Sequence, residues 1–158
     1  MANYIYPAPG VTGVESTLSL EIAADGTNDS LSVPSLQDIT VNAANDVFTW
    51  TQLDEGSKKQ IATTATNSIS MNLVLDQTTF FGSAGSGTTA SAAGIFGMSS
   101  QKDLVSFELY LGDESDGTTG KTISGEGYIT GLAPSVSADS PVWVSPITIT
   151  VTGDYTVA

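Results

Sequence analysis

Residues 147–152 read Ile-Thr-Ile-Thr-Val-Thr, and this stretch decides the fold. Its aliphatic and hydroxyl side chains alternate with a period of two, which places the aliphatic residues on one side of an extended chain and the threonines on the other. Isoleucine, valine and threonine also favour pleated strands, because their β-branched side chains pack well there. The stretch is therefore predicted to be a β-strand with one buried and one solvated face.

The same alternation recurs along most of the chain, and it predicts antiparallel sheets that are solvated on one side. Further strands are predicted at residues 14–22, 37–41, 47–53, 69–75, 105–111 and 121–130, the last interrupted by glycines. Helical periodicity is scarce. Residues 82–98 are rich in glycine and alanine and are predicted to form a loop or one short helix over 89–98, although Gly94 and Gly97 are poor helix formers.

The composition limits the chemistry of the chain. Its 158 residues suit a single domain over 1–158, and 40% of them are hydrophobic, which is enough for a core. It has no histidine, cysteine or arginine, so the usual general base, thiolate and guanidinium group are all missing. Its serines and threonines have no histidine partner that would activate them as nucleophiles. We therefore expect neither catalysis nor a cofactor.

The charge of the chain disfavours two classes of partner. There are 17 acidic residues against four lysines, giving a formal net charge of −13. Binding to a nucleic-acid backbone depends on basic residues that displace counterions, and an anionic membrane repels acidic proteins. The opening residues 1–7 have neither a basic region nor an apolar region, so we expect no Sec signal. Specific DNA binding and membrane binding are not predicted.

Three short motifs have a functional and an ordinary interpretation. The glycine-rich residues 82–89 lack the Gly-Lys-Ser/Thr ending of a phosphate-binding loop, so a flexible loop is favoured. The acidic turns at 113–117 and 25–29 offer oxygen ligands for Ca²⁺ but do not have EF-hand spacing. Solvated turns are favoured there, and we predict no metal site.

The polar residues of several predicted strands form the candidate functional site, because they are expected to share one sheet face without a positive charge. An ordinary solvated face usually mixes lysine with glutamate. The candidates are Glu15, Thr17, Ser19, Glu21, Ser70, Asn72, Ser106, Glu108, Thr148 and Thr150.

The C-terminal third of the chain carries a family resemblance. A glycine-flanked strand at 125–132 is followed by a Ser/Ala/Asp-containing crossover at 133–143, and then by the alternating threonine strand that ends at Gly153. This order resembles the major tail tube proteins of long-tailed bacteriophages. The strand at 14–22 and the long segment at 54–67 are also similar to that family.

The resemblance implies a mainly β fold, an antiparallel β-sandwich or half-barrel with one short helix and long loops, preceded by an N-terminal arm at 1–13. It implies that six copies close into a ring-shaped β-barrel and that the rings stack into a tube. Such a tube belongs to the virion tail, is assembled in the host cytoplasm, and meets other phage tail proteins at its ends. The candidate face would then line a lumen through which DNA passes without specific binding.

The segment at 54–67 is the candidate ring-stacking loop. Its residues Asp54, Glu55, Lys58 and Lys59 combine half of the lysines of the chain with two acids. Exposed ion pairs contribute little energy each, so they would set register more than strength. The alternative interpretation is a solvated hairpin tip.

Other functions stay open at this point. A related fold serves as the tube of a contractile secretion system or as a capsid decoration protein. A β-sandwich module that binds Ca²⁺ or carbohydrate is the alternative from another class, and it usually presents an exposed aromatic platform. Trp50 and Trp143 lie in or beside predicted strands, where we expect them to pack in the core.

Overall fold

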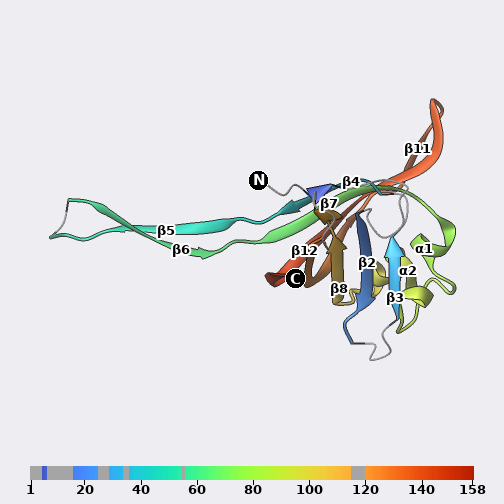
Figure 1. Cartoon of the computed structure of the whole chain (residues 1–158), viewed down its shortest axis with the longest axis horizontal. Coiled ribbons are helices and arrows are strands. Elements are labelled where there is room, and N and C mark those ends of the chain that lie inside the picture. The colour runs from blue at the N-terminus through green and yellow to red at the C-terminus, as the bar shows by residue number, and fades with distance from the viewer. Residues whose placement is uncertain (1–4, 7–15, 25–28, 34–35, 55, 115–119) are drawn as a thin grey trace.

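The computed structural model describes residues 5–6, 16–24, 29–33, 36–54, 56–114 and 120–158. Most of them belong to strands (Figure 1). The strands are β1 (Ile5–Tyr6), β2 (Thr17–Ile22), β3 (Ser30–Val33), β4 (Leu36–Asn42), β5 (Asn45–Thr51), β6 (Lys58–Thr64), β7 (Asn67–Val74), β8 (Val105–Tyr110), β9 (Asp113–Glu114), β10 (Thr122–Leu132), β11 (Ser135–Ser137) and β12 (Ser140–Val157). The helices are α1 (Gln77–Phe81) and α2 (Ala90–Gln101).

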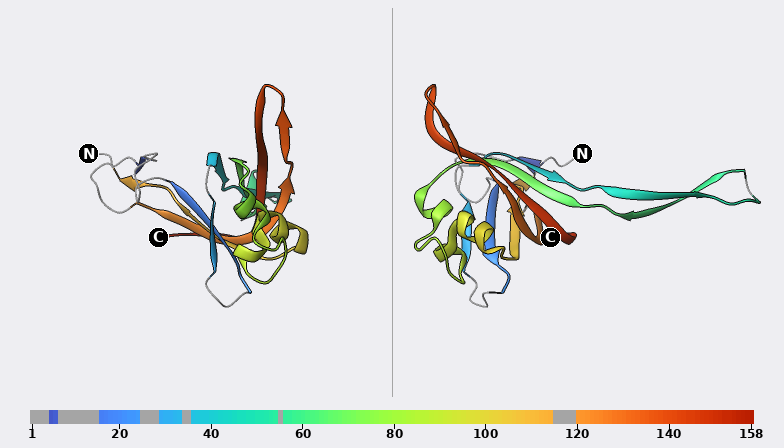
Figure 2. Two further views of the ribbon diagram at one scale, coloured as in Figure 1. Left: turned by 90° about the vertical axis from the view of Figure 1, so that its right-hand side faces the viewer. Right: turned by 180° about the vertical axis from the view of Figure 1, so that it is seen from behind.

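One antiparallel sheet organises the molecule. Its main path runs β3-β2-β8-β10-β12-β7-β4, and β11 pairs with β12 beyond that path. β12 is 18 residues long and pairs with β10, β7 and β11, so the threonine strand predicted at 147–152 lies at the centre of the sheet. The sheet curls into a half-barrel (Figure 2), which confirms the predicted mainly β class. The small β1–β9 pair lies apart from it, and the rest of the expected N-terminal arm at 1–13 is outside the described residues.

The core lies between the apolar face of this sheet and the two helices. Every second residue is buried in β2 and β8, in β7 from Ile69 onward, and in residues 145–151 of β12, as the alternation predicts. The sheet supplies Leu18, Leu20, Ile22, Ile69, Met71, Leu73, Val105, Phe107, Leu109, Ile147, Ile149 and Val151, and the helices add Phe80, Ala90, Ala93, Ile95 and Met98. Each fully buried large aliphatic or aromatic side chain stabilises the fold by roughly 1.5–3 kcal/mol.

The predicted short helix is present as α2, and a five-residue helix, α1, precedes it. Asp76 begins α1, since its carboxylate accepts a hydrogen bond from the backbone N–H of Thr79 at 3.0 Å. Gly94 interrupts α2 with a φ of 67°, which explains why glycine stands there. The two helices cover the end of the sheet beside β2 and β3 (Figures 1 and 2).

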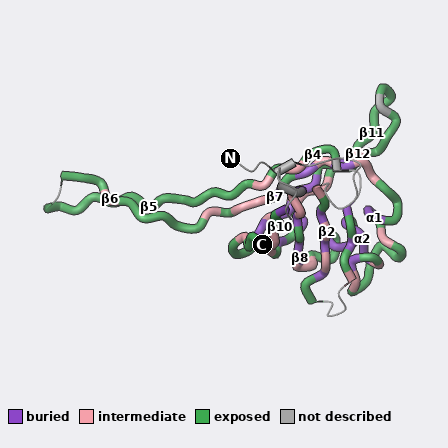
Figure 3. Tube along the Cα trace, viewed as in Figure 1, coloured by how far each residue is buried: buried purple, intermediate pink, exposed green. Residues whose placement is uncertain are grey.

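A two-stranded arm made of β5 and β6 extends far from the body (Figure 1). The segment predicted as a loop at 54–67 is therefore mostly strand: the chain turns near Asp54 and returns as β6. Alternation at 58–64 is weak because neither face of the arm is buried in the subunit, and all described arm residues are exposed or half-buried (Figure 3). The signal on which strand prediction relies is therefore missing there.

Candidate functional site: the polar face of the sheet

The register of the sheet aligns the predicted polar residues in rows. Directly opposed residues of antiparallel strands project from the same face. Glu21 of β2 is opposite Ser106 of β8, and Ser106 is opposite Glu126 of β10. Two residues away along each strand, Ser19 is opposite Glu108. Four of the predicted residues therefore lie together on one face, the face opposite to the core.

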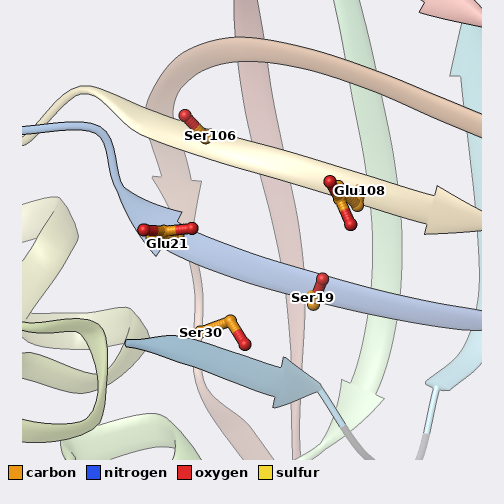
Figure 4. Close-up of a pocket in the computed structure, with 5 residues that line it drawn as sticks. All are labelled: Ser19, Glu21, Ser30, Ser106 and Glu108. Atoms are coloured by element: carbon orange, nitrogen blue, oxygen red, sulfur yellow. The ribbon is translucent and has the colours of Figure 1, made fainter. Parts of the chain in front are cut away.

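These four residues and Ser30 of β3 line a shallow depression of about 270 Å³ (Figure 4). Glu21 is half-buried and Glu108 is exposed. The strands β2, β3 and β8 hold the lining residues, and their opposite sides are fixed by buried leucine, valine and phenylalanine residues. The depression therefore presents two carboxylates and three hydroxyl groups on a rigid surface.

The other half of the face is built from β4, β7, β10 and β12. Ser70 is opposite Thr148 on one side and Thr40 on the other. The hydroxyl oxygens of Thr150 and Thr130 are hydrogen-bonded at 2.8 Å. Hydroxyl side chains thus line this half of the face, and those of Thr130 and Thr150 bond to each other.

Asn72 lies at the β4 edge of this half. Its amide nitrogen donates to both carboxylate oxygens of Asp38 at 3.0 Å. The amide therefore orients the Asp38 carboxylate.

Two predicted members of the face stand apart from these clusters. Thr17 is exposed at the start of β2, opposite Tyr110. Glu15 lies outside the described residues. The structure thus brings the remaining eight candidates onto one sheet, in two groups, and Thr17 onto its margin.

Sequence reasoning missed two acids of this face, Glu126 and Asp38. Glu126 lies between Ser106 and Thr152 in the row that starts at Glu21. The alternation of Ser124, Glu126 and Tyr128 with the residues between them was a usable signal, but the glycines of this strand obscured it. Asp38 also had a usable signal, because it alternates with the apolar Ile39 in the predicted strand at 37–41.

No strand of the large sheet contains a lysine. Lys58 and Lys59 belong to the arm, Lys102 follows α2, and Lys121 precedes β10. The charged residues on the described part of the face are therefore carboxylates, and the field that they create is negative throughout.

The expectation that both tryptophans pack in the core is wrong. Trp50 is 36% exposed on the arm, and Trp143 is 53% exposed near the β11–β12 hairpin. Both lie in strands as expected, but these strands extend beyond the body, where neither face meets a core (Figure 3).

The candidate ring-stacking residues lie on the arm. Asp54 is exposed at its turn, and Lys58 and Lys59 begin β6 opposite Thr51 and Trp50. Glu55 is outside the described residues.

The acidic turns are only partly visible. Asp113 and Glu114 form β9, and the rest of 113–117 is outside the described residues. Of 25–29, Asp29 is described, and it binds protein instead: its carboxylate accepts hydrogen bonds from the Ser91 backbone N–H at 2.9 Å and hydroxyl at 2.7 Å. These bonds hold the pKa of Asp29 below its ordinary value. Asp29 thereby accepts a hydrogen bond from a free backbone N–H at the start of α2. The residue before the helix, Thr89, makes no side-chain capping bond there.

Two further features are absent from the described residues. These residues contain no group of three or more acidic residues arranged to hold a metal ion. None of their helices is long and apolar enough to cross a membrane.

Comparison with solved structures shows the fold. A chain from the tail of an empty gene transfer agent particle with C6 symmetry superposes with a TM-score of 0.60 at 12% identity, covering 89% of this chain and 95% of that one. A chain of the PVC sheath-tube complex, an extracellular contractile injection system, gives 0.61 at 14% identity, covering 97% and 92%. A chain of the anti-feeding prophage baseplate gives 0.60 at 8% identity, covering 97% of both chains. No family model and no curated protein matches the sequence.

Proposed function

We propose that this chain is a structural, non-enzymatic subunit of the tube of a bacteriophage tail or of a related particle. In this proposal six copies close into a ring, and rings stack into a hollow tube through which the DNA genome passes. The observation that carries it is the pairing of a curled sheet with a continuous polar face that bears no lysine. The fold shared with a C6-symmetric particle tail supports the sixfold ring.

The open shape of the sheet gives a physical reason for ring closure. The sheet of one chain is open, with β3 and β4 at the ends of its path. Unpaired strand edges promote association with other chains, and a closed barrel removes them. Repeating one edge-to-edge contact around an axis gives a ring of identical subunits.

The charge of the proposed lumen serves to keep DNA from adhering. One carboxylate about 8 Å from a phosphate repels it by only about 0.5 kcal/mol at the dielectric constant of water, and salt screens part of this. A single residue therefore decides little. Glu21, Glu108, Glu126 and Asp38 recur in every subunit of every ring, and no lysine of the sheet offers a phosphate a binding point. The proposed lumen surface is weakly repulsive along its whole length.

The β5–β6 arm is the element that we propose to join adjacent rings. It projects from the body beyond the edges of the sheet (Figure 1) and carries Asp54, Lys58 and Lys59 on exposed or half-buried positions. Glu55, outside the described residues, belongs to the same proposed contact.

The tube of a contractile injection system is the second candidate. It is favoured by the fold shared with chains of the PVC sheath-tube complex and of the anti-feeding prophage. The two candidates differ in what passes through the tube, since the proposed phage tail conducts a DNA genome. A negative lumen suits the passage of DNA without adhesion, which is why the phage tail is placed first.

Electron microscopy of the purified protein at rising concentration tests the proposal. Negative-stain images are expected to contain sixfold rings and hollow tubes with a channel wide enough for duplex DNA. Closed particles of another symmetry without a channel would contradict it. Because assembly of a tube can require an initiating complex, the same imaging is repeated with the other tail proteins of the particle; monomers under both conditions would refute the tube role.

The Ca²⁺- or carbohydrate-binding module remains the alternative of another class. The exposure of Trp50 and Trp143 gives it an aromatic surface that sequence reasoning did not expect. Thermal melting with Ca²⁺ and with glycans separates it from the tube, since a ligand at 100 times its dissociation constant adds about 2.7 kcal/mol of stability. The tube role predicts no such shift.

A further inference from the structure

The β5–β6 arm has an aromatic face. Phe48 and Trp50 alternate with polar residues along β5, and Phe48 is directly opposite Ile61 of β6, so the three side chains share one face. The rings of Phe48 and Trp50 stack with centroids 5.9 Å apart and planes at 26°. We call the face formed by Phe48, Trp50 and Ile61 the aromatic face of the arm.

This face is uncovered in the isolated chain. Phe48 is 60% exposed and Ile61 is 57% exposed. A two-stranded ribbon is only marginally stable in water without a further layer to pack on. Apolar side chains gathered on a projecting element usually mark a contact with another molecule. The aromatic face therefore calls for a partner with a complementary apolar surface.

The opposite end of the molecule has an apolar pocket. It measures about 550 Å³ and lies beside α1 and the base of the β11–β12 hairpin, within the size range of ligand pockets. Its lining residues are Leu75, Asp76, Gln77, Phe80, Phe81, Pro134 and Trp143, and we call it the Trp143 pocket. The backbone N–H of Leu75 donates to the carbonyl of Trp143 at 2.9 Å, which fixes the two sides of the pocket to each other.

The pocket is open to another chain. Phe80 is buried, whereas Phe81 is 48% exposed and Trp143 is 53% exposed. Val136 and Val142 are exposed on the neighbouring hairpin, which lengthens the apolar surface. Among the described residues, the large exposed hydrophobic side chains thus gather mainly at two places, the arm and the surroundings of this pocket.

A second copy of the chain is the partner that fits. The arm lies at one end of the molecule, and α1 and the β11–β12 hairpin, which carry the pocket, lie at the other (Figure 1), so the arm of one chain cannot enter its own pocket. Charge also favours the arm as the contact. The chain as a whole carries −13, which makes most contacts between copies repulsive, but the arm, residues 45–64, carries only −1. Lys59 is opposite Trp50 and so places a cation on the aromatic face. The exposed Asp76 carboxylate lies in the pocket lining, within the strongly acidic body.

We propose that the aromatic face of the arm of one copy packs into the Trp143 pocket of a second copy. The inference rests on the proposed tube function and gives its inter-ring contact a partner surface. Two different surfaces meet, so the contact is heterologous and leaves a free arm and a free pocket at the ends of the assembly. Repetition of such a contact extends the assembly without limit, as a tube requires.

Cross-linking between two engineered cysteines tests this contact, because the chain has no cysteine of its own. Thr63 shares the aromatic face, whereas its neighbour Ala62 is opposite Val47 on the other face of the arm. Gln77 is exposed in the pocket lining. T63C and Q77C proteins are purified separately, mixed under assembly conditions and treated with a short bismaleimide. A62C mixed with Q77C is the matched control.

The proposal predicts a mixed T63C–Q77C product several-fold more abundant than the A62C–Q77C product, with the linked peptides identified by mass spectrometry. Rings and tubes that form without this excess would overturn the docking contact and leave the tube function standing. The same cross-link without any ring or tube would support the contact and refute the tube. Monomers without a cross-link, in the presence of the other tail proteins of the particle as well, would refute both.

Substitutions give an independent measurement. Phe48→Ser removes an aromatic side chain from the proposed contact, while Val47→Ser changes a residue of similar exposure on the opposite face of the same strand. Sedimentation is expected to show weaker assembly for F48S than for V47S, with equal melting temperatures of the monomers. Equal assembly of the two variants would contradict the proposal.

Discussion

Gly82 and Gly94 meet backbone to backbone where the end of α1 approaches the break in α2. Both have positive φ, 66° and 67°, and a Cβ atom added to Gly94 would overlap the backbone of Phe80, Phe81 and Gly82. Two backbone hydrogen bonds complete the junction: the N–H of Ser83 donates to the Ser91 carbonyl at 3.0 Å, and the N–H of Ala84 donates to the Ala92 carbonyl at 3.1 Å. The pair of helices that covers the core thus depends on two positions without side chains.

Gly94→Ala is expected to destabilise the fold strongly. The unfavourable backbone conformation alone costs about 1–3 kcal/mol, and the overlap adds to it. The free energy of unfolding from urea titration measures the effect. Gly56→Ala is the matched control, since Gly56 has nothing within 4 Å of an added Cβ, and it should stay within about 0.5 kcal/mol of the wild type. Equal stability of the two variants would show that α1 and α2 do not pack as described.

Replacing Glu21 and Glu108 with lysine is expected to slow the passage of DNA without preventing tube assembly. Both residues line the depression on the polar face, and lysines there would attract phosphates instead of repelling them. The rate of DNA release from particles, followed with a DNA-binding dye, measures the effect. Asp103→Lys, after α2, makes the same change in charge as either single replacement, Glu21→Lys or Glu108→Lys, and should release DNA normally. Unchanged release by the double variant would rule out a lumen position for this face.

Charge reversal on the arm is expected to disturb the stacking of rings. The variant Lys58→Glu with Lys59→Glu changes the net charge of the arm from −1 to −5, so that repulsion between copies reaches the proposed contact. Shorter or irregular tubes in electron micrographs, with recovery at high salt, are the expected result. Lys121→Glu, which changes charge outside the arm, serves as the control. Normal tube length in the double variant would exclude a stacking role for these lysines.

Asp29 makes stability depend on pH in acid. Its hydrogen bonds from Ser91 lower its pKa, so the folded state favours the ionised form. The stabilisation is therefore complete above the unfolded pKa of about 4 and is lost as the pH falls through the lower folded value. The difference in the free energy of unfolding between wild type and Asp29→Asn is expected to shrink as the pH falls through that range. A difference that is constant with pH would show that the Asp29 charge does not act on α2.

Tyr155 makes stability depend on pH in alkali. Burial raises its pKa, and its hydroxyl donates hydrogen bonds to the carbonyls of Asn42 at 2.7 Å and Ser68 at 3.3 Å. The contribution of Tyr155 to the free energy of unfolding is fully present below the pKa of about 10 in the unfolded state, and it is lost as the pH rises through the pKa in the folded state. Tyr155→Phe is expected to lose about 0.5–1.5 kcal/mol at neutral pH. Denaturation curves of both proteins from pH 7 to 11 should converge, and parallel curves would contradict this role.

The strands with one buried face were predictable, and so was the grouping of their polar residues. Leu18, Leu20 and Ile22 alternate with Ser19 and Glu21 because one side of β2 faces the core. The arm was not predictable in the same way. β6 pairs along its whole length with β5, but both of its faces are exposed or half-buried, so no alternation identifies it as a strand.

The sequence by itself determined the chemistry of this protein. The absence of histidine, cysteine and arginine, the excess of acids and the lysine-free strands are properties of composition and order, and they hold in any fold. Only the tertiary structure decided which of these residues meet. The row from Glu21 through Ser106 to Glu126 joins β2 to two strands that come much later in the chain, because sheet register is set by the packing of the opposite face. The exposure of Trp50 and Trp143 has the same origin: local sequence places an aromatic residue in a strand, and only the position of that strand relative to the core decides whether it is covered.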